Sequence, residues 1–189
     1  MRKPIIQLKN TSKSYPIAGK EFMALKKLDL SIQEAEFTGI VGPSGSGKTT
    51  LLNIIGSLDK PSTGDATVLG KEIKSLSHKE AANLRNFNIG FIFQICNLLP
   101  VYTVFENVEF ALLLQKKSAH ERKKAVIKEL EWVGIEDQAD KRPDKLSGGE
   151  SQRVAIARAM VKTPKIVLAD EPTANLDAEN SHNIMKILT

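Results

Sequence analysis

Short runs of alternating apolar and polar residues fill the first third of the chain, a pattern typical of strands buried on one face. Residues 6–9 and 28–32 alternate in this way, and residues 66–69 follow a turn signal. Residues 38–41 form a largely apolar run that predicts a strand leading into a glycine-rich segment. Residues 49–58 predict the helix after that segment. The pattern therefore predicts a strand-rich first part of the chain.

Helix-start signals dominate the middle of the chain. A serine or threonine followed three positions later by glutamate has the spacing of a capping box, which opens a helix. Such pairs between residues 77 and 121 are Ser77 with Glu80, Thr103 with Glu106, and Ser118 with Glu121.

Strand signals return on both sides of this helical stretch. Residues 88–93 predict a strand that ends at Gln94, and residues 166–169 predict a second one after a helix at 147–161. No strand signal occurs between about residues 95 and 155. The sequence therefore predicts an α/β core, built from residues 1–94 and 156–189, that is interrupted by a helical subdomain at residues 95–155.

Composition and length fit an ordinary globular domain. The 189 residues are 41% hydrophobic and 26% charged, which suits one domain or a core with an inserted lobe. No apolar run approaches the roughly 18 residues that a membrane span needs, and the N-terminus does not have the pattern of a signal peptide. The single Cys96 excludes an internal disulfide and favours a reducing compartment. We therefore expect any membrane role to require a partner.

A net charge of +5 permits contact with nucleic acid or an anionic membrane surface. The densest basic segment, residues 116–128, also contains Glu121, and apolar residues at helical spacing follow it in Val126, Leu130 and Val133. This mixture favours a solvated helix face above a buried stripe.

The glycine-rich segment matches the G-x-x-x-x-G-K-[ST] loop that holds nucleotide phosphates. Its glycines let backbone N–H groups converge on an anion, and the helix behind it adds its positive end. Lys48 supplies a charge for the outer phosphates, and the Thr49 hydroxyl suits Mg²⁺. The expected nucleotide-binding residues are Gly42, Ser44, Gly45, Ser46, Gly47, Lys48, Thr49 and Thr50.

Two adjacent carboxylates follow the apolar run at residues 166–169. We expect Asp170 to hold a magnesium ion. Strand alternation would point Glu171 the other way, where it could act as a general base or orient a water. The alternative is a pair of surface carboxylates in the turn before Pro172, and the four apolar residues upstream argue against it.

The segment Ser147-Gly148-Gly149-Glu150 opens a predicted helix and admits two interpretations. Ser147 and Glu150 have capping-box spacing, so the segment could be a well-capped helix start alone. The glycine pair, however, weakens a first helical turn and exposes its N–H groups. Placed across an interface, such a helix start could bind the γ-phosphate held by a second subunit.

The glycine-rich loop, the Ser147 segment and the two carboxylates, in this order along the chain, resemble the nucleotide-binding subunit of an ABC transporter. The similarity continues through residues 152–159 and covers essentially the whole chain. It implies a P-loop NTPase with a RecA-like core, an N-terminal antiparallel β-subdomain and an inserted helical subdomain. Residues 90–94, 97–100 and 106–108 are most similar to the macrolide-export and lipoprotein-release branch.

The resemblance also implies roles for single residues. Tyr15 matches the aromatic residue that stacks on adenine, and Gln94 matches the glutamine that senses Mg²⁺ and communicates with the membrane subunit. Residues 175–177 match the loop that links two active sites. On this basis Glu171, Lys48 and Gln94 are the expected catalytic residues, with ATP and Mg²⁺ as ligands.

The resemblance further implies the partners. Two copies would form an ATP-dependent head-to-tail homodimer, with each nucleotide between the glycine loop of one copy and Ser147 and Gly149 of the other. An integral membrane permease would hold the ATPase at the cytoplasmic face of the cell membrane as a peripheral subunit. No nucleic acid is expected as a partner.

The sequence departs from the family pattern at a few positions. Cys96 stands where that branch often has phenylalanine, Ala35 replaces a common glycine, and Glu150 stands where glutamine is common. The family's switch histidine lies on a strand beyond the helix that follows Glu171, and His182 is too near Glu171 to match it. We therefore expect a C-terminally truncated ATPase domain.

Two other functions remain open from sequence alone. A nucleic-acid or ribosome-directed ATPase of this superfamily would carry long coiled-coil arms or a second cassette, and the 98 residues between Lys48 and Ser147 are too few for such arms. A non-hydrolysing, ATP-dependent interaction module would bind nucleotide in the same way but would lack turnover.

Overall fold

The computed structural model describes residues 4–188, and the chain forms two compact units that divide between Leu84 and Arg85. The first unit carries the glycine-rich loop, and the second carries the two carboxylates and the Ser147 helix start. The predicted boundaries of the helical subdomain, residues 95–155, stay a prediction.

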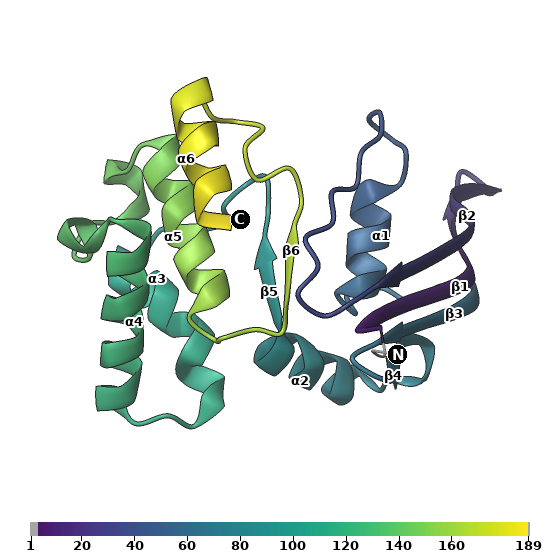
Figure 1. Cartoon of the computed structure of the whole chain (residues 1–189), viewed down its shortest axis with the longest axis horizontal. Helices are drawn as coiled ribbons and strands as arrows, with labels where there is room; N and C mark the ends of the chain where they lie inside the picture. Colours follow the sequence, from purple (N-terminus) through teal and green to yellow (C-terminus); the bar gives the residue numbers. More distant parts are fainter. Residues whose placement is uncertain (1–3, 189) are drawn as a thin grey trace. The chain divides into compact units, whose positions relative to one another are not determined.

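The first unit is built on a four-stranded antiparallel sheet with strand order β2-β1-β3-β4 (Figure 1). β1 (Ile6–Ile17) and β2 (Lys20–Ile32) form a long hairpin, whose tight turn places Ala18 and Gly19 in the left-handed region. β3 (Thr63–Val68) pairs with β1, and β4 (Lys71–Glu72) pairs with β3, before the 3₁₀ turn η1 (Ile73–Ser75). The strands predicted at 6–9, 28–32 and 66–69 are confirmed, apart from their exact ends.

Helix α1 (Lys48–Ile55) lies along this sheet (Figure 1) and buries Leu51, Ile54 and Ile55. It ends before the predicted residue 58, because Ser57 adopts a left-handed φ of 53°. The Leu58 and Asp59 N–H groups then turn back to the Asn53 carbonyl at 2.8 and 3.2 Å. This closed end fixes the direction in which the chain leaves the helix.

The strand predicted at residues 38–41 is wrong for this structure. Residues 36–43 have no regular secondary structure, and Val41 is 96% exposed. A strand is stabilised by hydrogen bonds to a neighbouring strand, and none of the strand pairings among residues 4–188 includes this segment. An apolar run alone therefore did not suffice to form the strand.

Helix α2 (His78–Asn88) spans the division between the units, and the predicted capping box is formed by Ser77 and Glu80. In the second unit, β5 (Ile89–Ile92) and β6 (Ile166–Ala169) pair in parallel. The strands predicted at 88–93 and 166–169 are confirmed, apart from the exact ends of the first. Bonds from the Lys165 N–H to the Asn88 carbonyl and from the Asp170 N–H to the Ile92 carbonyl extend the pairing at both ends.

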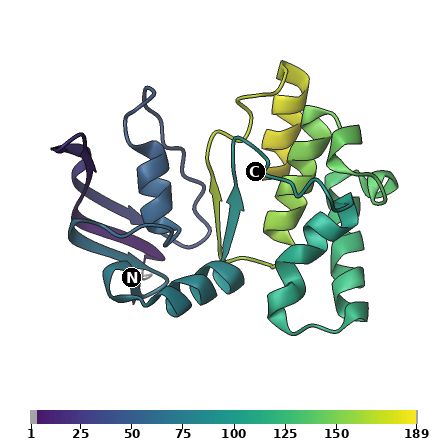
Figure 2. The same cartoon turned by 180° about the vertical axis from the view of Figure 1, so that it is seen from behind.

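Helices make up most of the second unit (Figure 2). The capping boxes predicted at Thr103 and Ser118 open α3 (Val104–Glu109) and α4 (Ala119–Val133). The remaining elements are the 3₁₀ segments η2 (Phe110–Gln115), η3 (Glu136–Gln138) and η4 (Pro143–Lys145), and the helices α5 (Gly148–Met160) and α6 (Ala178–Leu188).

Helix α5 is at the centre of the second unit and contacts α3, α4, α6 and β5. Its Val154, Ile156 and Ala157 are fully buried or nearly so. It approaches β5 so closely that a Cβ at Gly90 would lie 2.9 Å from the Ala159 carbonyl oxygen. The C-terminal half of α5 therefore packs closely against β5.

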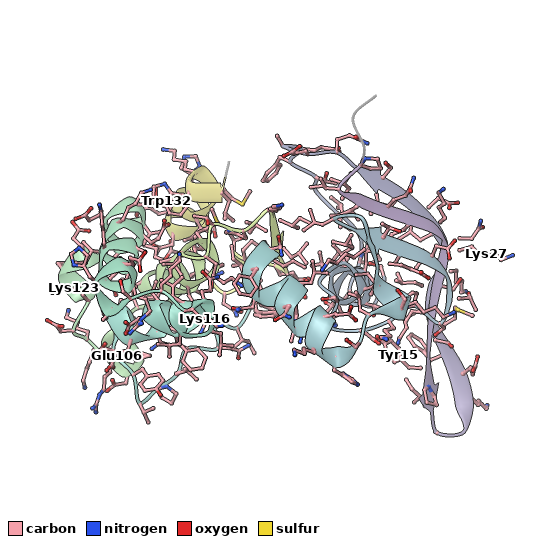
Figure 3. The ribbon with its side chains drawn as sticks, turned by 90° about the horizontal axis from the view of Figure 1, so that it is seen from below. Tyr15, Lys27, Glu106, Lys116, Lys123 and Trp132 are labelled. Atoms are coloured by element: carbon pink, nitrogen blue, oxygen red, sulfur yellow. The ribbon has the colours of Figure 1, made fainter. Side chains whose placement is uncertain are left out.

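The basic segment on α4 is a solvated face, as predicted. Val126, Leu130 and Val133 are buried, whereas Lys123, on the surface of the second unit in Figure 3, is exposed. Within residues 4–188, no helix combines the length and the apolar character that crossing a membrane requires.

Candidate nucleotide-binding site

The glycine-rich loop reaches the start of α1 through two glycines in the left-handed region, Gly45 at φ 78° and Gly47 at φ 92°. Gly47 is also sterically required, because a Cβ there would lie 2.5 Å from the Ala24 carbonyl oxygen. A Cβ at Gly42 would lie 2.7 Å from the Ser46 Oγ. The loop therefore needs glycine for its own geometry, which supports the predicted phosphate-binding conformation.

Lys48 bends back over this loop. Its Nζ donates to the carbonyl oxygens of Gly42 at 2.8 Å and Pro43 at 3.1 Å. As the first residue of α1, it stands at the positive end of the helix together with the following Thr49 and Thr50. An anion bound here would thus meet a lysine ammonium, backbone N–H groups and the helix dipole.

Tyr15 lies on β1 within this same unit (Figure 3), and its hydroxyl bonds to one residue of α1 and to one beyond the end of that helix. Its hydroxyl donates to Asp59 Oδ2 at 2.8 Å, just beyond the end of the helix, and it forms a hydrogen bond with the Thr50 side chain near the start. Burial and the bond to Asp59 raise the Tyr15 pKa. The predicted adenine-stacking residue is therefore held next to the loop helix.

Asp59 is a part of the site that the sequence did not reveal. Its other carboxylate oxygen accepts from Lys13 Nζ at 2.6 Å. Burial raises the Asp59 pKa, but the bonds from Lys13 and Tyr15 outweigh this and leave it below its ordinary value. Lys13 Nζ also lies 4.9 Å from the centre of the Tyr15 ring.

The two carboxylates follow β6 in the second unit. The Asp170 backbone continues the strand pairing, but Glu171 leaves it with a left-handed φ of 47°. Strand alternation therefore does not define the direction of the Glu171 side chain. The prediction that alternation points it away from the Asp170 side chain was wrong in this respect. A tight turn follows, closed by a bond from the Ala174 N–H to the Glu171 carbonyl at 3.2 Å.

The start of α5 combines the predicted capping box with exposed residues at the helix start, the two features on which its alternative interpretations depend. Ser147 and Glu150 form a complete capping box, with bonds of 3.2 and 2.7 Å. The Ser147 N–H, and after it the Ser147 side chain, bond to the Glu150 carboxylate and lower its pKa. Ser147 and Gly148 are nevertheless exposed, whereas Gly149 is buried. A Cβ at Gly149 would lie 2.5 Å from Asn180 Oδ1 of α6, so close packing also requires this glycine.

Gln94 stands in an irregular loop, residues 93–99, between β5 and α3. The Asn175 Nδ2 donates to the Gln94 carbonyl at 3.3 Å, and Asp177 caps α6 through the Asn180 N–H at 2.8 Å. A small cavity of about 180 Å³ lies between this loop and the start of α5, lined among others by Gln94, Cys96 and Asn175. The structure thus brings together the glutamine loop, the α5 start and residues 175–177.

Comparison with known proteins identifies the group to which this arrangement belongs. The profile of the family described as ABC transporter matches residues 25–174. The chain belongs to the ABC transporter family. It is an ATP-binding cassette of that family and falls in its ATPase class, as the three motifs predict.

Relatives match nearly the whole chain. The uncharacterized ABC transporter ATP-binding protein YvrO of Bacillus subtilis is 44% identical over 98% of this chain and 81% of its own length. The macrolide export ATP-binding/permease protein MacB of Chlorobaculum tepidum is 45% identical over 98% of this chain, which spans 28% of that protein.

The fold is confirmed in the same way. The dimeric ATP-binding cassette MJ0796, described in a post-hydrolysis state bound to ADP and Pi, superposes with a TM-score of 0.90 at 43% identity. It covers 97% of this chain, which spans 81% of that one. The curated MJ0796 sequence comes from Methanocaldococcus jannaschii. The predicted P-loop NTPase fold class is therefore correct.

Proposed function

We propose that this chain binds Mg-ATP at its glycine loop, pairs head to tail with a second copy, and hydrolyses ATP to drive a membrane permease. The observation that carries the proposal is the loop geometry. Gly45 and Gly47 hold left-handed backbone at the start of α1, with Lys48 folded over the loop. A glycine loop of this form, placed before a helix, presents N–H groups and the helix dipole to an anion such as a polyphosphate.

The side chains assigned to the metal fit magnesium by their chemistry. Thr49 offers a hydroxyl oxygen, Gln94 an amide oxygen and Asp170 a carboxylate oxygen, all hard ligands that Mg²⁺ accepts. When bound with ATP, Mg²⁺ would neutralise negative charge on the phosphates.

The chain's own residues would supply position and charge. The loop N–H groups and Lys48 bind the phosphates and hold the terminal one in place. Tyr15 orients the base through ring stacking. Glu171 accepts a hydrogen bond from the attacking water and aligns it in line with the leaving oxygen.

The start of α5 would complete the site of a second copy. Ser147 and Gly148 are exposed there, and Ser147 satisfies one N–H group of the helix while the first-turn dipole remains available to an anion. The related cassette MJ0796 forms a dimer, which supports the pairing of two copies of this chain.

A protein partner near Gln94 is supported by exposed apolar side chains. Ile95 is 69% exposed and Val101 71% exposed, and Leu114 of η2 is 76% exposed. Tyr102 and Phe110 add two aromatic rings whose centres lie 6.2 Å apart. Exposed apolar side chains thus recur within one stretch of sequence, residues 95–114, which supports a protein interface there, and we assign this interface to an integral membrane permease at the cytoplasmic face of the membrane.

Substitution of Glu171 tests the proposal. Glu171→Gln keeps the shape but removes the carboxylate, so ATP binding should persist while turnover falls by about 10²-fold or more. ATP-bound dimers should then accumulate, and size-exclusion chromatography with ATP and with ADP would detect them. Hydrolysis at the wild-type rate, or a monomer that stays monomeric with ATP, would contradict the assignment.

A further inference from the structure

Arg158 joins helix α5 to the loop that carries Gln94. Its guanidinium donates to the carbonyl oxygens of Cys96 and of Asn97, the latter at 2.8 Å. These acceptors lie two and three residues after Gln94, in a segment without regular structure. Asn97 itself adopts a left-handed conformation with φ 48°, a region that asparagine tolerates better than most residues do.

A second contact connects the same helix to the same loop. Cys96 Sγ donates to Gln152 Oε1 at 2.9 Å, and Gln152 is only 2% exposed. Helix α5 therefore contacts the loop through two side chains that are six residues apart on the helix. The same helix begins at Ser147, so one rigid element carries the helix start on one side and the anchor of Gln94 on the other.

We propose that Arg158 is a positioning residue, which fixes the Gln94 loop on α5 so that Gln94 meets bound Mg-ATP. The inference rests on the proposed role of Gln94. It adds that the placement of Gln94 comes from α5, through Arg158, and not from the loop sequence itself. A guanidinium suits this task because its planar fork can bond two successive carbonyls at once.

Arg153 provides a matched control on the same helix. Its Nη1 donates to the Val133 carbonyl at 2.9 Å, at the end of α4 and away from the Gln94 loop. Arg153→Gln and Arg158→Gln each remove one guanidinium bonded to backbone carbonyls. A purely structural role of Arg158 would make the two variants behave alike.

Cys96 is the only cysteine, so the thiol reports directly on this loop. The colorimetric thiol reagent DTNB would be reacted with nucleotide-free protein well below its melting temperature. Arg158→Gln should speed the reaction at least about tenfold, because loss of the charge-assisted bonds favours local opening. The reaction rate of Arg158→Lys should lie between those of wild type and Arg158→Gln. The rate of Arg153→Gln should stay within about twofold of wild type.

The charge effect of the substitution works against the expected result. Burial raises the Cys96 pKa, and the Arg158 charge partly lowers it again. Removing that charge alone would leave less thiolate and slow the reaction. A faster reaction in Arg158→Gln therefore reports opening of the loop.

The second measurement is the factor by which Mg²⁺ strengthens binding of a fluorescent ATP analogue. Arg158→Gln should reduce this factor about fivefold or more, with Arg153→Gln unchanged and Arg158→Lys partly restored. Equal behaviour of the two glutamine variants in both measurements would overturn the proposal. A faster thiol reaction in Arg158→Gln together with an unchanged Mg²⁺ factor would also overturn the proposal. If wild-type protein binds no Mg-ATP, the proposed function fails, and the thiol measurement still decides whether Arg158 anchors the loop.

Discussion

The hydroxyl of Tyr15 donates to Asp59 Oδ2 at 2.8 Å, so a residue on β1 is fixed to the segment just after α1. Lys13 bonds to the other Asp59 oxygen at 2.6 Å and to the Lys60 carbonyl at 2.8 Å. These bonds fix the Tyr15 hydroxyl to the segment that follows α1, the helix behind the glycine-rich loop.

Substitutions of Tyr15 should separate stacking from this hydrogen bond. Tyr15→Ala removes the ring and should weaken ATP binding by about 1–3 kcal/mol, roughly 5- to 150-fold, if the ring stacks on adenine. Tyr15→Phe keeps the ring and should lose about 1 kcal/mol or less of unfolding free energy, with a small effect on binding. Isothermal titration calorimetry and thermal melts measure both quantities.

Inorganic triphosphate is the control ligand for Tyr15. It shares the phosphates of ATP but has no base, so Tyr15→Ala should bind it as tightly as the wild type does. Weakened triphosphate binding would show that Tyr15 shapes the phosphate loop and does not recognise the base.

Substitutions of Lys48 and Ser147 should affect different steps, nucleotide binding and dimerisation respectively. Lys48→Ala removes a charged contact to the phosphates and should weaken ATP binding by monomers roughly 10- to 150-fold. Ser147→Arg places a large side chain on the exposed start of α5 and should leave monomer binding intact but abolish ATP-driven dimerisation. Titration at low protein concentration and size-exclusion chromatography separate the two effects. Equal loss of binding in both variants would place Ser147 in the same site as Lys48.

The glycine pair at the start of α5 gives a sharper test of the two interpretations of that segment. A Cβ at Gly149 would lie 2.5 Å from Asn180 Oδ1, and Asn180 is itself bonded to Asp177 at 2.7 Å. Gly149→Ala should therefore cost about 1–3 kcal/mol of unfolding free energy, because Asn180 cannot move without losing that bond. Chemical denaturation measures the loss, and Asn180→Ala in the same chain should restore most of it.

Substitution of Gly148 should cost less, since a Cβ added there would lie 3.6 Å from Leu176 Cδ2, an ordinary contact distance. Gly148→Ala should leave the unfolding free energy unchanged or raise it by about 0.5–1 kcal/mol through helix propensity. If the helix start binds a partner's phosphate, the added methyl should still weaken ATP-driven dimerisation. Normal dimerisation of Gly148→Ala would favour a helix cap and nothing more.

Local signals made much of the fold predictable. Ser77, Thr103, Ser118 and Ser147 all form the capping boxes that their spacing predicts, because a capping box depends only on residues within one turn. Local signals failed at residues 38–41, where the apolar run predicts a strand that the structure does not contain. Its formation depends on a neighbouring strand, which its own sequence does not encode.

The candidate site shows the same limit. Lys48 and the loop glycines were recognisable from their spacing alone. Asp59, Arg158 and Asn180 were not, because each acts on a residue far away in the sequence, as Asp59 does on Tyr15 across 44 positions. Such a residue has no local pattern, and only the folded chain places it against its partner.

Lys162 gives a prediction that depends on pH alone. It directly follows α5 and its C-cap, and its Nζ donates to the Arg85 carbonyl at 3.1 Å and the Ile89 carbonyl at 2.7 Å. Burial lowers its pKa from 10.5 to about 8. Below pH 8 the lysine is charged in both the folded and the unfolded chain, so the full cost of burying the charge is present there.

Between pH 8 and 10.5 the folded chain releases this proton before the unfolded chain does. The unfolded chain then binds more protons, so the contribution of Lys162 to the unfolding free energy should rise across that window and level off above it. Lys162→Met removes the titration while keeping most of the side-chain volume. Urea denaturation of both proteins from pH 7 to 10.5 gives the difference, in which other titrating groups cancel. The wild type should gain stability relative to Lys162→Met as the pH rises, and a difference independent of pH would mean that Lys162 keeps an ordinary pKa.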